Sequence, residues 1–176
     1  MKLFFVDTET GGLDPSKHSL LAIGYLIYDD ESDEIVDTGV IYHKADEYIV
    51  TPSALRINGL NLVEVAEKGM AKEEIIQKFK QLAEEHGKFL PAGWNLQFDV
   101  GFLKALLGEA YREVFYYKGI DIFTLYYLVY GESVSLKEAA VKVLGEHIRE
   151  RQWHDALIDI TTTFAIYKEL RKAIWR

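Results

Sequence analysis

MKLFFVDTETGGLDP, residues 1–15, runs from an apolar stretch (Lys2 to Val6) into two acids, Asp7 and Glu9, one residue apart. The apolar stretch predicts a buried β-strand. Side chains two apart in a strand point to the same face, so the two carboxylates would meet, with Thr8 turned away. Two like charges at so short a distance repel one another unless a cation or a proton lies between them.

The alternative is that the strand ends at Val6 and DTETGG is a solvated turn. The two glycines that follow, which let backbone approach a ligand closely, and the exposed Leu13 beside the acids favour a site.

The composition limits the classes of protein to which the chain can belong. With 176 residues and 49% hydrophobic content, we expect one compact domain over residues 1–176. There are no cysteines, which excludes disulfides and thiolate metal sites. The apolar runs are too short to span a bilayer and no secretory signal is recognisable, so we expect a cytoplasmic protein without membrane association.

The net charge bears on nucleic acid as a partner. A formal charge of −8 argues against tight, sequence-independent binding of long duplex, because that affinity comes mostly from lysines and arginines on phosphates. It does not exclude a nucleic-acid substrate that is held through metal ions, because divalent cations reverse the sign of a carboxylate pocket.

The hydrophobic pattern predicts strands and helices in a mixed order. Residues 20–28 and 34–42 are rich in β-formers and flank an acidic turn, DDESDE, so the first three strands should form an antiparallel meander. Residues 88–94 predict a fourth strand, which Pro91 would place at an edge or at a strand end. Helices are predicted at residues 52–58, 62–68, 72–86, 97–107, 122–129, 136–144 and 156–173. This order indicates an α/β domain, with helices packed on a mixed sheet.

A third acid lies in an apolar setting, GWNLQFDVGFL (residues 93–103). Asp99 falls in the first turns of what should be a buried helix, and a buried carboxylate needs a partner. One alternative is that Asp99 only interacts with the helix dipole. Separately, Asn95 is a candidate helix cap, and Asp99, four positions later, would face the end of the sheet.

The last polar stretch, QWHDALIDI (residues 152–160), precedes the final helix. Periodicity alone pairs Asp155 with Asp159, which are four residues apart on one helical face. His154 and Asp159 are five apart and converge only if His154 lies in the loop before the helix. Asp155 would then cap the helix start.

The three stretches together resemble the motifs of the DnaQ-like 3′-to-5′ exonucleases, DEDDh branch, in chain order. FVDTETGGLDP is similar to the D-x-E motif, GWNLQFDVGFL to N-x-x-x-D and HDALID to H-x-A-x-x-D. The stretches ALRINGL, GIDIFTL and SLKEAAVKVLG between them are also similar to the family, so the resemblance extends over nearly the whole chain. Each motif alone is weak evidence for this family, whereas three motifs in this order are strong evidence.

The resemblance implies a ribonuclease H-like fold, with a five-stranded mixed sheet flanked by helices. It also implies hydrolysis of phosphodiester bonds at the 3′ end by two Mg²⁺ or Mn²⁺ ions, roughly 3.5–4 Å apart, with release of nucleoside 5′-monophosphates. The implied metal ligands are oxygens, as these hard cations prefer, and belong to Asp7, Glu9, Asp99 and Asp159. His154 would be the general base that accepts the proton of the attacking water.

Substrate contacts are also implied by the resemblance. The backbone of Thr10 and Gly11, the side chain of Leu13 and the nearby Asn95 would surround the terminal base and sugar of a single-stranded 3′ end. DNA is favoured over RNA. Many proofreading relatives carry two threonines after D-x-E, whereas this chain has Thr10-Gly11-Gly12, which removes a hydroxyl from the grip on the terminal nucleotide.

Several other functions remain open from the sequence. The chain could be the proofreading subunit of a DNA polymerase, act with a repair partner, or be an exoribonuclease that trims RNA. A phosphatase of the haloacid dehalogenase type would need a second aspartate at the position of Glu9. A non-catalytic relative would be expected to have lost an acid, and no acid is missing.

Overall fold

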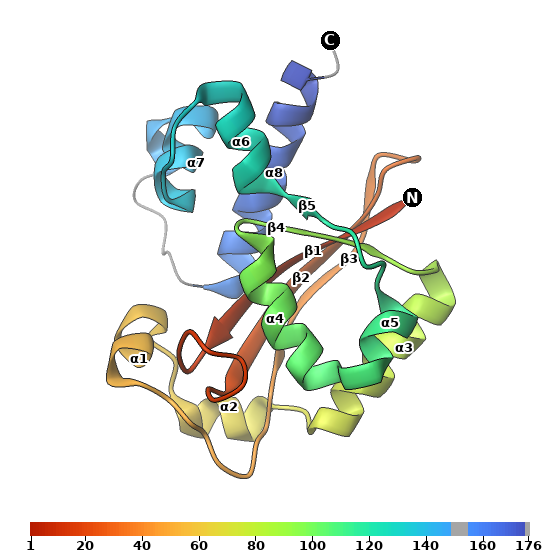
Figure 1. Cartoon of the computed structure of the whole chain (residues 1–176), viewed down its shortest axis with the longest axis vertical. Coiled ribbons are helices and arrows are strands. Elements are labelled where there is room, and N and C mark those ends of the chain that lie inside the picture. Colours follow the sequence, from red (N-terminus) through yellow and green to blue (C-terminus); the bar gives the residue numbers. More distant parts are fainter. Residues whose placement is uncertain (149–154, 175–176) are drawn as a thin grey trace.

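A five-stranded mixed sheet forms the centre of the molecule in the computed structural model, which describes residues 1–148 and 155–174 (Figure 1). The strand order is β3-β2-β1-β4-β5. The first three strands form an antiparallel meander, and β4 and β5 add to it in parallel. The strands are β1 (Lys2–Thr10), β2 (Leu20–Asp29), β3 (Glu34–Tyr42), β4 (Leu90–Gly93) and β5 (Ile120–Asp121).

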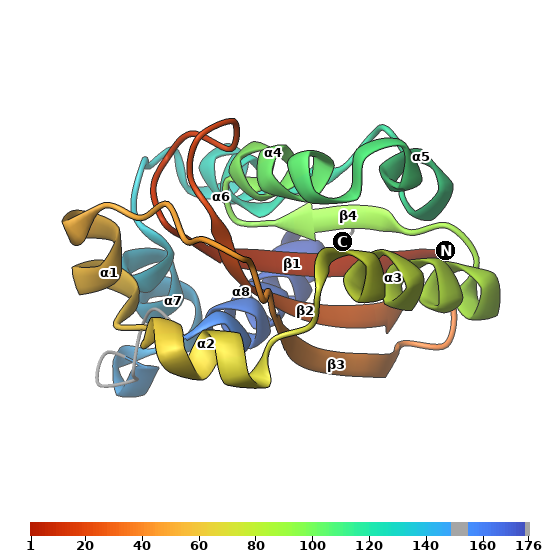
Figure 2. The same cartoon turned by 90° about the horizontal axis from the view of Figure 1, so that it is seen from below.

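Helices cover both faces of this sheet (Figure 2). The alternation of β1 divides its side chains: Phe4 and Val6 pack with α3, α4 and α5, whereas Leu3 and Phe5 pack with α6, α7 and α8. The helices are α1 (Pro52–Asn58), α2 (Leu62–Lys68), α3 (Lys72–His86), α4 (Leu96–Leu107), α5 (Tyr111–Val114), α6 (Ile122–Tyr130), α7 (Leu136–Leu144) and α8 (Ala156–Ile174), with short 3-10 helices at Gly108–Ala110 and Glu146–Ile148.

The predicted fold class, an α/β layered domain of ribonuclease H-like type, is confirmed. The predicted meander and the long helices are also present, with ends that differ by one or two residues. Two short elements, α5 and β5, were not assigned from the sequence, because four and two residues carry too little periodicity. A single domain over residues 1–176 stays a prediction.

Strand β1 differs from the expectation in its length. It continues to Thr10, and both acids pair with β2, Asp7 opposite Gly24 and Glu9 opposite Ala22. The alternative of a solvated turn after Val6 is therefore wrong. The acids therefore stand on the sheet, where β1 pairs with β2 but extends beyond its pairing with β4, which ends at Phe5.

The sequence predicts Pro91 either on an edge strand or at a strand end. The structure shows that it is not on an edge strand but lies near the start of β4. Strand β4 is an interior strand, between β1 and β5. The parallel pairing of β5 involves only Ala92 and Gly93, so it starts after Pro91. A proline that lacks an N–H group is tolerated there because no ladder partner lies opposite it on that side.

Candidate active site

The end of β1 brings three carboxylates together. Asp7 and Glu9 point to the same face of the sheet, the face that α8 covers, and α8 contributes Asp159 from its first turn. One carboxylate oxygen from each of the three lies within 4.8 Å of the others. Glu9 and Asp159 are only 8% and 7% exposed. The predicted convergence of Asp7, Glu9 and Asp159 is therefore present in the fold.

Helix α8 begins where the sequence predicted, and Asp155 caps it. Its Oδ1 accepts hydrogen bonds from the N–H groups of Leu157 (3.0 Å) and Ile158 (3.2 Å). The side chain of Asp155 therefore satisfies the helix start. Asp159, one turn later, is the residue of the pair that joins the acids of β1.

A glycine of β2 allows α8 to approach the acids. Gly24 pairs with Asp7, and a Cβ atom at Gly24 would lie 2.3 Å from the carbonyl oxygen of Ala156. Only a residue without a side chain lets the helix start pack this closely on the strand. The sequence reasoning missed Gly24, although a glycine inside an apolar strand pattern is itself a signal of close backbone approach.

Asp99 reaches the cluster from the other face of the sheet. It lies on α4, is 3% exposed, and its Oδ1 accepts hydrogen bonds from the N–H (2.8 Å) and the hydroxyl (2.7 Å) of Thr8. Thr8 is turned away from Asp7 and Glu9, as predicted, and this orientation is what lets it hold Asp99. Asp99 is not within 4.8 Å of all three other acids, but its charge acts on Asp7. Thr8 was not identified as a site residue from the sequence.

The raised pKa values of the acids reflect burial and the mutual repulsion of their carboxylates. Burial, and then the charges of Asp99, Glu9 and Asp159, hold the pKa of Asp7 well above its ordinary value. Burial, followed by the charge of Asp159, raises the pKa of Glu9 to about 8. Burial raises the pKa of Asp99 to about 7, against the hydrogen bonds from Thr8.

The cluster has no cationic side chain from the described part of the chain. Within residues 1–148 and 155–174, no lysine or arginine forms an ion pair with Asp7, Glu9 or Asp99. The donors are all carboxylate oxygens, which are the ligands that Mg²⁺ and Mn²⁺ prefer. The residues present therefore fit the divalent ions that the family resemblance implies.

The loop after β1 is held by its backbone. Gly11 donates its N–H to the carbonyl of Ser19 (2.7 Å) and accepts from the N–H of Thr51 (2.7 Å). The carbonyl of Thr10 accepts from the side-chain amide of Asn58 (3.1 Å). Thr10 and Gly11 are buried, and these particular backbone groups already have partners inside the protein. Their predicted contact with a nucleotide stays a prediction.

Leu13 and Asn95, the other two predicted substrate contacts, both lie at the surface. Leu13 is 84% exposed, as expected for a residue that meets a ligand. Asn95 precedes α4 with a positive φ of 56°, and its side chain makes no capping hydrogen bond. Asp121 takes this role instead, since its Oδ1 accepts from the N–H of Leu96 (3.2 Å). The suggestion that Asn95 caps the helix with its side chain is therefore wrong.

His154 lies outside the described residues, so its predicted role as general base stays a prediction.

A cavity of about 350 Å³ adjoins the acids. Glu9 lines it together with Leu157 of α8, with Asn58 at the end of α1 and with the two residues that follow, Gly59 and Leu60. Asn58 is buried, and it links the end of α1 to β1 through its hydrogen bond to Thr10. The stretch ALRINGL was noticed for its family likeness, but no site residue was assigned in it.

Comparison with known proteins shows the family to which the chain belongs. The family model described as Exonuclease (RNase_T) matches residues 4–167, which include Asp7, Asp99 and Asp159. The chain belongs to the exonuclease family. Members of this family are nucleases, that is, hydrolases of nucleic acid. A search of curated proteins finds no match.

Solved structures share the fold. E. coli Exonuclease I in complex with a dA16 oligonucleotide is similar with a TM-score of 0.80 and 20% identity, over 97% of this chain and 41% of that one. Exonuclease I from Methylocaldum szegediense is similar with a TM-score of 0.77 and 23% identity, over 97% and 40%. The zinc-bound E. coli Exonuclease I–ssDNA complex has a TM-score of 0.78 and 20% identity, over 99% and 41%. This chain thus spans about two fifths of the length of these proteins.

In the described parts of the chain, every helix is too short or too polar to span a bilayer.

Proposed function

We propose that this chain is a metal-dependent 3′-to-5′ exonuclease of the DEDDh type that acts on single-stranded DNA. The observation that carries the proposal is the buried cluster of Asp7, Glu9 and Asp159, with Asp99 beside it and no lysine or arginine partner from the described residues for Asp7, Glu9 or Asp99. Four carboxylates in one place disfavour their own ionisation. A divalent cation would remove this penalty.

The four acids would hold two Mg²⁺ or Mn²⁺ ions. Asp7 would be central to this set of ligands, because the charges of all three other acids act on it. When bound, such ions neutralise the charge that develops on the phosphate and lower the pKa of water. Thr8 fixes one oxygen of Asp99, and the pairing of Asp7 and Glu9 with β2 fixes the backbone of both, so these ligands would be positioned before substrate arrives.

The protein side chains would divide the remaining work. His154 would accept the proton of the attacking water, because histidine as a residue type has an ordinary pKa near 6.5, close to neutral pH. The cavity beside Glu9 would receive the 3′-terminal nucleotide, because its volume of about 350 Å³ lies in the range of about 300–1,000 Å³ typical of ligand pockets. Leu13 would contact the terminal base from the adjoining loop, with Asn95 and the backbone of Thr10 and Gly11 nearby.

Single-stranded DNA is the proposed substrate because the similar E. coli Exonuclease I was solved with a dA16 oligonucleotide and as an ssDNA complex. A time course on 5′-labelled DNA and RNA oligonucleotides, with Mg²⁺ or with EDTA, tests this. We expect a ladder that shortens from the 3′ end only with Mg²⁺, faster on DNA than on RNA.

Asp99→Asn should abolish this ladder, whereas Asp33→Asn, at the far end of the molecule, should leave it unchanged. Cleavage in EDTA or an active Asp99→Asn enzyme would refute the proposed site. A faster ladder on RNA would reassign the substrate to RNA.

A further inference from the structure

Two cavities lie along α4 and the segment that follows it, outside the acid cluster. One, of about 420 Å³, is lined by Asn95, by Gln97 of α4 and by Lys118, and it reaches Pro91 of β4 and Asp121 of β5. The other, also about 420 Å³, is lined by Lys104 and Arg112 among others. Tyr111 and Tyr117 line both cavities, so the two adjoin. We call this pair of cavities the α4–β5 groove.

The α4–β5 groove combines aromatic rings with positive charge. Tyr117 is 88% exposed, and the ammonium of Lys118 lies 5.5 Å from the centre of its ring. Lys104 lies 5.3 Å from the ring of Tyr111, and Arg112 lines the same cavity. Tyr111 itself is buried, so the exposed ring of the groove is that of Tyr117. An exposed ring next to lysines and arginines is the feature with which proteins stack the bases and pair the phosphates of single-stranded nucleic acid.

The acids of the groove do not cancel this charge. Two line it, Glu109 and Asp121. The oxygens of Asp121 accept hydrogen bonds from the N–H of Leu96 and from the hydroxyl of Thr124. In a chain of net charge −8, the three cations and two acids that line the groove leave it with one excess positive charge.

The groove and the cavity beside Glu9 lie on opposite sides of the catalytic acids. The cavity beside Glu9 is lined by Ala22 of β2 and Val40 of β3, whereas the groove is lined by Pro91 of β4 and Asp121 of β5. In the sheet, β2 and β3 lie on one side of β1, and β4 and β5 on the other (Figure 1).

Helix α4 links the groove to the acids. Asn95, in the wall of the groove, precedes Asp99 by four residues, which is about 6 Å along a helix. A strand whose phosphate lies at the acids therefore has its next nucleotides within reach of the groove.

We infer that the α4–β5 groove binds the part of a single-stranded substrate upstream of the scissile phosphate, with a base stacked on Tyr117 and phosphates near Lys118, Lys104 and Arg112. This inference rests on the proposed function and adds to it a second binding site. The strand would run from the cavity beside Glu9, across the acids and over the first turn of α4, into the groove.

Affinity for a fluorescein-labelled dT dodecamer, measured by anisotropy with Ca²⁺ in place of Mg²⁺, tests the groove. Tyr117→Ala should raise Kd about tenfold, because a stacked base is lost. Tyr116→Ala is the matched control: Tyr116 is the adjacent tyrosine, is 42% exposed, and is not among the residues that line the groove, so Kd should not change.

The salt dependence tests the phosphate contact. Lys118→Gln should reduce the slope of log Kd against log salt by about 0.7, the value for one phosphate of a single strand. Lys68→Gln, which changes an exposed lysine of α2 paired with Glu64, should leave the slope unchanged. An unchanged Kd in Tyr117→Ala together with an unchanged slope in Lys118→Gln would overturn the inference.

A small substrate separates this inference from the proposed function. The p-nitrophenyl ester of thymidine 5′-phosphate has no upstream strand, so Tyr117→Ala should cleave it at the wild-type rate. If the wild type cleaves neither this ester nor DNA, the proposed function fails and the groove fails with it. If the wild type cleaves both, while Tyr117→Ala binds the dodecamer normally and Lys118→Gln keeps the wild-type slope, only the groove is refuted. A slower ester reaction in Tyr117→Ala would assign Tyr117 a structural role and also refute the inference.

Discussion

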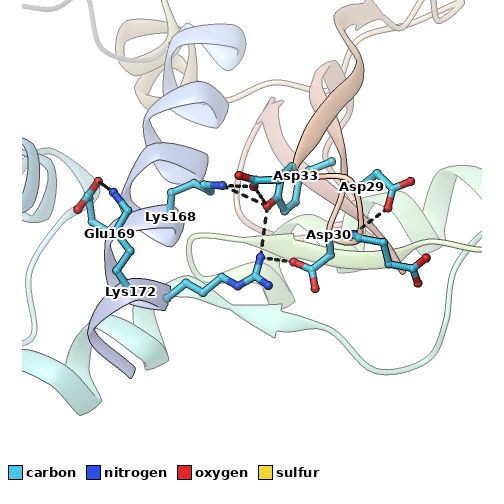
Figure 3. Close-up of polar contacts among 9 residues, drawn as sticks. Asp29, Asp30, Asp33, Lys168, Glu169 and Lys172 are labelled. Carbon is cyan, nitrogen blue, oxygen red and sulfur yellow. Dashed lines mark hydrogen bonds and ion pairs between the residues drawn. The ribbon is translucent and has the colours of Figure 1, made fainter. Parts of the chain in front are cut away.

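Carboxylates at the two ends of α8 have neighbours of opposite charge. Near its C-terminus, Lys168 and Arg171 form ion pairs with Asp33 and Asp30 of the turn between β2 and β3, next to the hydroxyl of Tyr28 (Figure 3). At its N-terminus, Asp159 meets further acids, those of β1. The first cluster joins the hairpin to the helix, and the second concentrates charge of one sign.

The pKa values follow this difference. The hydrogen bond from Lys168 lowers the pKa of Asp33, whereas burial and neighbouring acids raise the pKa of Asp7 and Glu9. For Asp30 and Asp33, which join the hairpin to α8, the chain supplies its own cations. At the end of β1 the described residues supply no lysine or arginine to Asp7 or Glu9, and under the proposed function metal ions would supply the positive charge.

The largest expected effect compares one acid from each cluster. Asp7→Asn should lower the rate of DNA cleavage about a thousandfold or more, because loss of this proposed metal ligand removes several kcal/mol of stabilisation of the transition state. Asp33→Asn should leave the rate unchanged, since Asp33 only joins the hairpin to α8. Initial rates on the labelled oligonucleotide test both. Equal losses in the two variants would erase the distinction between the clusters.

A second test moves α8 without changing any acid. Gly24→Ala places a Cβ atom 2.3 Å from the carbonyl of Ala156, so the helix start and Asp159 must shift. A displacement of this kind can lower a rate about a hundredfold, and overpacking should cost about 1–3 kcal/mol of stability. The control is Gly39→Ala on β3, where the new Cβ would meet the movable end of Tyr25 at 3.2 Å. If Gly24→Ala cleaves DNA like wild type, the close approach of α8 has no role in positioning Asp159.

A smaller loss is expected from Thr8→Val. This change removes the hydroxyl that donates to Asp99 but keeps the backbone N–H donor. Loss of a hydrogen bond that orients a metal ligand lowers activity or metal affinity about 10–100-fold. Thr161→Val on α8, where the hydroxyl bonds only to helix carbonyls, is the control. The concentration of Mg²⁺ needed for half-maximal rate should rise in Thr8→Val alone, and an unchanged value would remove Thr8 from the site.

The smallest effect concerns stability against pH. The pKa of Glu9 is raised from 4.5 to about 8 in the folded protein, so the folded state holds its proton more tightly than the unfolded state. In EDTA, the melting temperature should therefore fall as pH rises from 4.5 to about 8. Mg²⁺ should reduce this fall, because it replaces the protons. Glu9→Gln in EDTA should show a weaker fall.

For the ion pairs between α8 and the turn that joins β2 and β3, stability depends on pH in the opposite direction and over a different pH range. The pKa of Asp33 is lowered, so its contribution to stability is complete above the ordinary value of 3.8 and is lost only as pH falls below it. A melting temperature in EDTA that rises between pH 4.5 and about 8 would contradict the account of the acid site.

The sequence predicted most of the fold and the four acids because both leave local signals. Asp7 and Glu9 lie two apart on an apolar strand, and the long helices show their apolar periodicity. The roles of Thr8 and Gly24 could not be predicted, because each depends on a partner distant in sequence: Asp99 for the hydroxyl, and Ala156 for the missing side chain. Asp121 replaces the side chain of Asn95 at the start of α4 for the same reason. Alternation within a strand says which face a side chain occupies but not which helix will cover it.

Calorimetric titration of Mn²⁺ into the metal-free protein tests the central claim most directly, which is that the acids of β1 require a cation from outside the chain. We predict that the wild type and Asp33→Asn bind Mn²⁺ with the same affinity and that Asp7→Asn loses this binding. The absence of binding in the wild type, or equal binding in Asp7→Asn, would contradict the claim.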